Sequence, residues 1–189
     1  SWVGPLSIGS GASGAAQVLQ IYSNSDTYGA IFFGDATSGA GRYVGDISYY
    51  HNDNYMRFST AGNERLRIDS NGKIGVGGAP SAWQASTISN VLQLGTACLF
   101  NYNNDYFHVG QNFYWDGSNY KYVANDEATR LLQDNGQFTF YGAASGSADA
   151  NITWIERLRI ESGGTIRTQN GVQSGGNSTG GFKFNSIYS

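Results

Sequence analysis

The sequence predicts an all-β fold built from tandem, irregular β-hairpin or sandwich-like units. Three observations predict it: short segments alternate apolar and polar residues, turn residues separate these segments, and one such pattern recurs along the chain. Gly accounts for 27 of the 189 residues, well above its usual share of ~7%. With 13 Tyr, 10 Phe and 4 Trp, the chain carries more large apolar surface than a disordered protein, so we expect it to fold.

One hairpin pattern occurs twice with high similarity and a third time more weakly. Residues 64–74 (ERLRIDSNGKI) recur as residues 156–166 (ERLRIESGGTI), and a shorter copy occupies residues 129–138. Aromatic residues in the stretch 45–55 align with those in 110–120. The chain therefore divides into a connector (1–14), a first repeat unit (15–79), a second (80–142), a shortened third (143–171) and a segment rich in Gly, Ser and Asn (172–189).

Each copy predicts a strand, a turn and a second strand. In residues 64–69, Leu66 and Ile68 point to one face while Arg65 and Arg67 point to the other, which is the period of two of a half-buried strand. A turn follows at 69–72 (DSNG), because Asn and Gly tolerate a left-handed backbone.

The other two copies predict further hairpins, centred on residues 135–136 and 163–164. Residues 125–133 include good helix formers, but their alignment with the strand copies predicts a strand. A short helical turn is expected at residues 82–86, after Pro80. The tail from 169 to 181 lacks periodicity and is expected to be a loop or linker.

Charge and composition exclude several classes of partner. The net charge of −3 lacks the basic excess that a nucleic-acid-binding protein needs. No stretch approaches the ~20 apolar residues of a membrane span, so membrane insertion is not expected. Cys98 is the one cysteine and cannot form a disulfide within the chain; its apolar surroundings predict a buried side chain.

Residues 62–77 (GNERLRIDSNGKIGVG), followed closely by Pro80 and Ser81, resemble a repeat of bacteriophage tail fibre and tail spike proteins. In such proteins the repeat typically precedes an intramolecular chaperone of the endosialidase type, which aligns three chains and then cuts itself away. The resemblance implies a homotrimer in the virion tail, with other tail proteins as partners. Because such chaperones cut just after a serine, Ser189 is a candidate processing site.

This chain departs from the repeat in three ways. Arg167 and Leu132 replace a Gly and an Arg of the first copy, and no chaperone domain is present. The two substitutions are compatible with hairpins, but they do not support identical roles for all copies.

The small size of each unit also favours several chains. A unit of ~60 residues buries only ~60% of its unfolded surface and leaves sheet edges unpaired. Packing of three chains around one axis would remove roughly a few hundred Å² of apolar area per unit from water. At ~25 cal/mol per Å², this burial would add several kcal/mol of stability per chain. The expected assembly is an elongated homotrimer.

Three segments place aromatic residues around Asn or Asp turns: 49–55, 101–108 and 114–120. Sugar binding uses flat aromatic faces beside amide or carboxylate groups. The alternative is that the turns are ordinary hairpin turns and the aromatic residues are cross-strand pairs. The candidate glycan-binding residues are Tyr49, Tyr50, Asn54, Tyr55, Tyr114, Trp115, Asn119 and Tyr120.

Arginines and glutamates recur in the hairpin copies. They could bind an anionic ligand such as sialic acid or phosphate, or form ion pairs on the outer sheet face or between chains. The neutral Leu132 in the middle copy favours the structural alternative. The residues expected to form ion pairs are Glu64, Arg65, Arg67, Arg130, Glu156, Arg157 and Arg159.

The sequence offers no catalytic motif. Nucleophile-elbow and phosphate-loop patterns are absent, and His51 and His108 lack the further ligands of a zinc site, so neither an enzyme nor a metal or cofactor is expected. The expected function is a structural and host-recognition module that adheres to bacterial surface glycan. Two alternatives stay open: a polysaccharide depolymerase, which would release reducing ends, and a cellular lectin or adhesin, which gene neighbourhood would distinguish.

Overall fold

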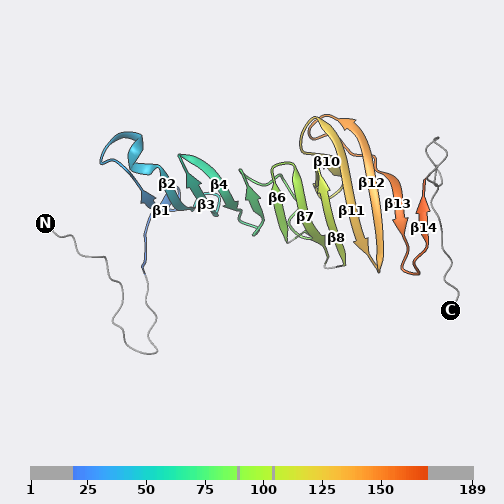
Figure 1. The fold of residues 1–189 in the computed structure, drawn as a ribbon. Coiled ribbons are helices and arrows are strands. Elements are labelled where there is room, and N and C mark those ends of the chain that lie inside the picture. Colours follow the sequence, from blue (N-terminus) through green and yellow to red (C-terminus); the bar gives the residue numbers. More distant parts are fainter. Residues whose placement is uncertain (1–18, 89, 104, 170–189) are drawn as a thin grey trace, which may run out of the picture.

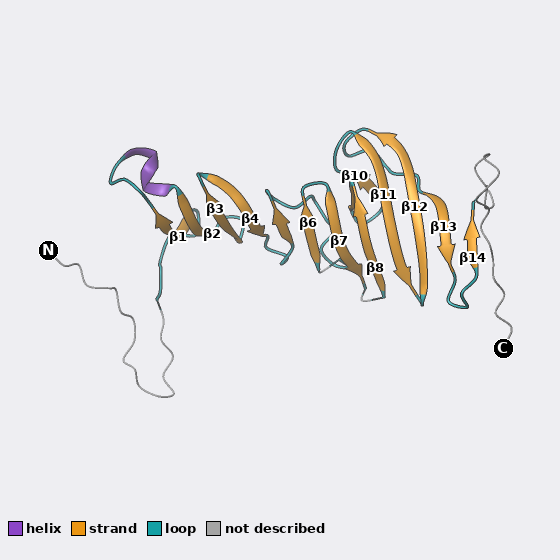
Figure 2. Cartoon of the chain, viewed as in Figure 1, coloured by secondary structure: helices purple, strands orange, loops and turns teal. Residues whose placement is uncertain are grey.

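A computed structural model describes residues 19–88, 90–103 and 105–169, and this part of the chain is almost entirely β (Figures 1 and 2). The all-β prediction is confirmed. The described residues contain no α-helix, and their one 3-10 helix is the short segment Gly39–Tyr43. The helical turn expected at 82–86 does not form; residues 85–87 make a simple turn instead.

The strands, in chain order, are β1 (Tyr28–Phe33), β2 (Gly45–Tyr50), β3 (Tyr55–Thr60), β4 (Asn63–Ile68), β5 (Ile74–Val76), β6 (Val91–Leu94), β7 (Ala97–Tyr102), β8 (Tyr106–Gln111), β9 (Phe113–Trp115), β10 (Tyr120–Tyr122), β11 (Asp126–Asp134), β12 (Gln137–Gly146), β13 (Ile155–Ile160) and β14 (Ile166–Thr168). The three predicted hairpins are present as β4–β5, β11–β12 and β13–β14. The segment with helical propensity, 125–133, forms most of β11, as its alignment with the strand copies predicted.

Twelve of the strands form one elongated sheet, in nearly sequential order (Figure 1). All neighbours are antiparallel except β5 and β6, which are parallel. β9 and β10 leave this sheet and pair with each other, so that β8 pairs with β11. The hairpins are therefore joined edge to edge, and the unit boundary predicted at 142/143 lies within β12.

The sheet has two chemically different faces. Residues paired across neighbouring strands point to the same face, so the register assigns every side chain. One face carries Arg57, Arg67, Arg130 and Arg159, and we call it the arginine face. All twelve strands contribute to the other, the apolar face, through Ile31, Phe33, Ile47, Met56, Phe58, Leu66, Ile68, Ile74, Val76, Leu92, Leu94, Ala97, Leu99, Phe107, Val109, Leu131, Phe138, Phe140, Leu158, Ile160 and Ile166.

None of the side chains on the apolar face is buried within the described part of the chain. Phe33 is 58% exposed at one end of the sheet, Leu94 44% near the middle and Ile166 59% at the other end. The face is also hollowed, since Ile74, Leu92 and Phe107 line a cavity of about 430 Å³. An apolar surface of this extent marks an interaction site in a soluble protein.

Within the described residues, the arginine face carries a packed core only over the second half of the sheet. There the β9–β10 hairpin and the loop before β6 pack on β6 to β8 and enclose the main core, which contains Trp83, Ile88, Val91, Cys98, Phe100, Phe113 and Tyr114. Cys98 is buried, as expected, and burial raises the pKa of its thiol to about 12. No residue of β1 to β5 belongs to a core cluster of the described residues.

Asn112 holds the point at which the chain leaves the sheet between β8 and β9. Its backbone is left-handed, with φ of +65°, and its side chain is 1% exposed. The amide nitrogen donates to the carbonyl oxygens of Ala124 and Glu127, at 3.1 and 3.0 Å, and the amide oxygen accepts from the Ala124 N–H at 2.7 Å. The Asn112 side chain therefore links the end of β8 to the start of β11 by hydrogen bonds.

We expect Asn112→Ala to lower the free energy of unfolding by about 3 kcal/mol, because it removes the three hydrogen bonds of a buried side chain. Asn135→Ala is the matched control: Asn135 also has a positive φ but is exposed at the β11–β12 turn. Its loss should be limited to backbone strain of about 1 kcal/mol. Equal losses in denaturant unfolding of the two variants would contradict this role of Asn112.

Candidate functional site

The described residues bring one arginine into an aromatic enclosure on the arginine face. Arg130 lies in β11, between Gly110 of β8 and Tyr141 of β12. Its guanidinium carbon lies 4.6 Å from the ring centroid of Tyr120, 4.3 Å from that of Tyr141 and 4.8 Å from that of Trp154. Cation–π attraction to three rings stabilises the guanidinium in this position.

Arg130 is nearly desolvated. Only 8% of the residue is exposed, its Nε has no hydrogen-bond partner, and no carboxylate of the described residues forms an ion pair with it. Burial lowers the pKa of the guanidinium, while the Tyr120 and Tyr141 hydroxyls act in the opposite direction. A guanidinium stays charged at neutral pH, so the site contains a buried positive charge.

A cavity of about 270 Å³ opens beside this charge. It lies between the main sheet and the β9–β10 hairpin, and its lining comes from β7, β8, β9, β10 and β11. The lining residues are Tyr102, Tyr106, His108, Trp115, Tyr120, Arg130 and Leu132. The volume is slightly below the ~300–1,000 Å³ of cavities for drug-sized ligands, so it suits one small ring.

His108 forms part of the wall of this cavity as a neutral imidazole. Its ring stacks on Phe100, with centroids 4.3 Å apart, and is 2% exposed. Burial, together with the charge of Arg130, lowers its pKa to about 3. Nδ1 is buried and has no hydrogen-bond partner among the described residues.

The two aromatic clusters that align in the sequence form hairpins with the same register. Tyr50 pairs with Tyr55 at the β2–β3 turn, and Trp115 pairs with Tyr120 at the β9–β10 turn. Their ring centroids lie 4.6 and 4.8 Å apart. The first hairpin lies in the main sheet and the second in the covering layer, so equivalent residues have different surroundings.

The second cluster contributes two residues to the cavity, Trp115 and Tyr120. Tyr114 points the other way: it is 8% exposed, belongs to the core, and its hydroxyl donates to Asp149 Oδ1 at 2.8 Å. These contacts favour the structural alternative for Tyr114. Asn119 lies in the exposed turn, where its N–H donates to Asp116 Oδ1.

The first cluster is divided between the two faces of the sheet. Tyr50 and Tyr55 stack on the arginine face, beneath Arg57 and Arg67 respectively. Tyr49 points to the apolar face, and its hydroxyl donates to Asn54 at 3.1 Å. These four residues do not form one surface.

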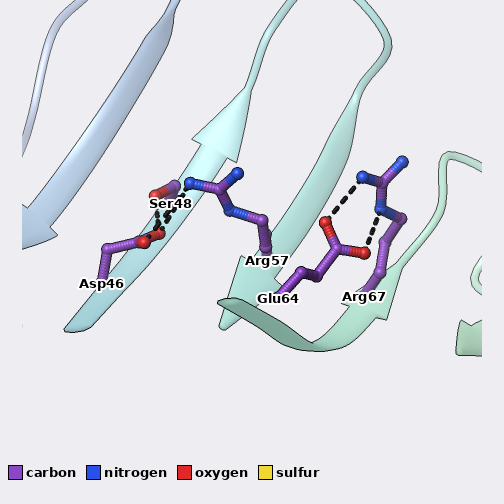
Figure 3. A network of polar contacts seen from close by, with 5 residues as sticks. All are labelled: Asp46, Ser48, Arg57, Glu64 and Arg67. Carbon is purple, nitrogen blue, oxygen red and sulfur yellow. Dashed lines mark hydrogen bonds and ion pairs between the residues drawn. The ribbon is translucent and has the colours of Figure 1, made fainter. Parts of the chain in front are cut away.

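Ion pairs stabilise the arginine face of the first repeat (Figure 3). Arg57 contacts both carboxylate oxygens of Asp46, at 3.2 and 3.3 Å, and Ser48 also donates to Asp46. Burial opposes ionisation of Asp46, but these hydrogen bonds and the charge of Arg57 hold its pKa below the usual value. Arg67 binds Glu64 through two hydrogen bonds of 2.9 and 2.7 Å.

A β-bulge explains how Glu64 and Arg67, three positions apart, reach the same face. In a regular strand such residues point to opposite faces. The β3–β4 register shifts between Phe58 and Ser59, which leaves Arg65 as an extra residue. The third repeat has the same bulge, and Arg159 there pairs with Glu156.

The remaining expected ion-pair residues have other partners. Arg65 donates to the Thr60 hydroxyl at 3.1 Å, and Arg157 donates to Gln169 at 3.1 Å. Arg130 lies in the aromatic enclosure, because β11 has no bulge at this position against either neighbour. Ser189 lies outside the described residues.

Sequence reasoning did not assign Tyr141 and Trp154 to this site, because both come from other parts of the chain. A signal was nevertheless present for Arg130. Thr129 occupies the position that Glu64 and Glu156 occupy in the other copies, so the middle copy lacks the acid as well as the second arginine.

The described residues contain no group of three or more His, Cys, Asp or Glu side chains arranged to hold a metal ion. Among these residues, too, no helix has the length and apolar character needed to cross a membrane. Comparisons with protein-family models, curated proteins and solved structures found no match to this chain.

The lowered pKa of His108 predicts a pH-dependent stability. An unfolded His has a pKa of ~6.5, so between pH 6.5 and about 3 the unfolded chain binds one more proton than the folded chain. The free energy of unfolding should fall by about 1.4 kcal/mol per pH unit as the pH drops from 6 to 5. Chemical denaturation at several pH values tests this, and His108→Phe should reduce the slope. A wild-type stability that is flat over this range would contradict a buried, neutral His108.

Proposed function

We propose that this chain is a segment of a bacteriophage tail fibre or spike that builds the fibre as a homotrimer and binds bacterial surface glycan. The observation that carries the proposal is the uncovered apolar face, to which all twelve strands of the sheet contribute. The repeat at residues 62–77 supplies the resemblance to tail fibres.

Packing against sister chains would supply the layer that the apolar face lacks. Full burial of a large aliphatic or aromatic side chain stabilises a protein by about 1.5–3 kcal/mol. Each half-exposed side chain therefore has about 1 kcal/mol to gain, and the face holds many of them. Three copies with their apolar faces toward a common axis would bury the whole face at once.

The first half of the sheet also favours packing against sister chains. Among the described residues, strands β1 to β5 contribute no side chain to a buried core cluster on either face. A single-layer sheet cannot shield its apolar residues from water and is marginal alone. The resemblance to fibre proteins favours three copies, whereas two copies would form a sandwich.

The cavity beside Arg130 supports glycan binding. Trp115 and Tyr120 provide aromatic rings for the apolar side of a pyranose, and Arg130 and His108 provide polar atoms. Its described lining contains no Asp or Glu. Glycoside hydrolysis usually needs two carboxylates, so we propose a binding site and not a catalytic one.

Light scattering coupled to size-exclusion chromatography tests the assembly. The wild-type protein should have the mass of three chains, and Val109→Lys or Phe140→Lys should reduce that mass because a lysine would be buried in the interface. Ser118→Lys, in the exposed β9–β10 turn, is the control and should leave the mass unchanged. A single-chain or two-chain mass for the wild type would contradict the trimer.

Adsorption of the purified protein to host cells tests recognition. Trp115→Ala should weaken adsorption by about tenfold, because it removes one aromatic face of the cavity. Tyr43→Ala is the control, since Tyr43 is exposed in the 3-10 helix far along the sheet. Release of reducing ends from host polysaccharide, or equal adsorption of the two variants, would contradict the proposed role.

A further inference from the structure

We infer that the cavity beside Arg130 binds a sugar that carries a carboxylate, so that the glycan recognised is acidic. The inference rests on the proposed function, because it names the class of glycan that the same site takes. It depends on the unpaired charge of Arg130 and on the shape of its surroundings.

Arg130 differs from the other arginines that define the arginine face. Arg57 pairs with Asp46, Arg67 with Glu64 and Arg159 with Glu156. Within the described ranges Arg130 has no acidic partner, although it is the most buried of the four. The acid is missing because Thr129 replaces the glutamate of the other copies and the bulge that would turn it inward is absent.

A buried charge without a counter-ion is costly, and the aromatic rings compensate for only part of that cost. A ligand carboxylate would supply the missing partner, since a guanidinium binds a carboxylate through two parallel hydrogen bonds. Arg130 lines the cavity, and its buried Nε has no hydrogen-bond partner among the described residues, so the guanidinium still has capacity to donate.

The rest of the cavity fits a sugar ring better than a bare anion. Trp115 and Tyr120 present rings from the β9–β10 hairpin, and the neutral His108 adds a polar side chain to the wall. A volume of about 270 Å³ suits one monosaccharide. A uronic acid or a sialic acid combines a ring of this kind with a carboxylate.

Titration calorimetry with oligosaccharides of glucuronate, galacturonate and sialic acid tests the inference, with the carboxyl-reduced form of each as the neutral counterpart. At least one acidic probe should bind about tenfold more tightly than its reduced form. A phosphorylated glucose oligosaccharide that binds more tightly than every carboxylate probe would overturn the choice of carboxylate.

Leu132→Glu is the sharpest variant, because Leu132 lines the cavity two positions from Arg130 on the same face. The carboxylate introduced by this variant should form an ion pair with Arg130, and the preference for the acidic probe should be lost. Leu132→Gln, of the same size but neutral, should keep the ratio of acidic to reduced affinity. Thr37→Glu adds the same charge in the exposed loop after β1, at the far end of the sheet, and should leave binding unchanged.

The outcomes separate the two proposals. If the reduced probes bind as tightly as the acidic ones, or if Leu132→Glu keeps the preference, the inference fails while glycan binding stands. If no probe of either kind binds, and Trp115→Ala adsorbs to cells like the wild type, both the inference and glycan recognition by this cavity are overturned.

Discussion

The structure depends on one constraint: side chains alternate across a strand, and each of the twelve neighbouring strands turns apolar side chains to the same side of the sheet. Phe58 lies beside Leu66, Leu99 beside Val109, and Phe138 beside Ile160. The register therefore collects the aliphatic residues into one continuous face. The described residues form a covering layer only on the opposite face, and only over half its length; we propose that sister chains cover the apolar face.

The arginine face shows how small backbone changes alter the use of a repeated sequence. A bulge brings Glu64 beside Arg67 and Glu156 beside Arg159, and both pairs are neutralised within the chain. Without a bulge, β11 directs Arg130 inward, where it meets aromatic rings instead of an acid. Arg65, Arg130 and Arg157 occupy the same position of the repeat. Arg65 and Arg157 are exposed, whereas Arg130 of the middle copy lines a cavity.

Sequence patterns predicted much of the fold and less of the site. Self-similarity and turn residues located the three hairpins, and alignment of the copies correctly overrode the helical propensity around Arg130. The alignment also identified Trp115 and Tyr120. It could not show that β9–β10 leaves the sheet, because this depends on the buried hydrogen bonds of Asn112, nor that Tyr141 and Trp154 close the site from later in the chain.

Determination of the assembled structure by crystallography or electron cryo-microscopy tests the central claim most directly. The account predicts three chains related by a threefold axis, with Leu99, Val109 and Phe140 turned toward that axis and the Arg130 cavity open to solvent on the outside. An assembly in which these three residues face solvent, or in which the Arg130 side of the sheet lines the axis, would contradict it.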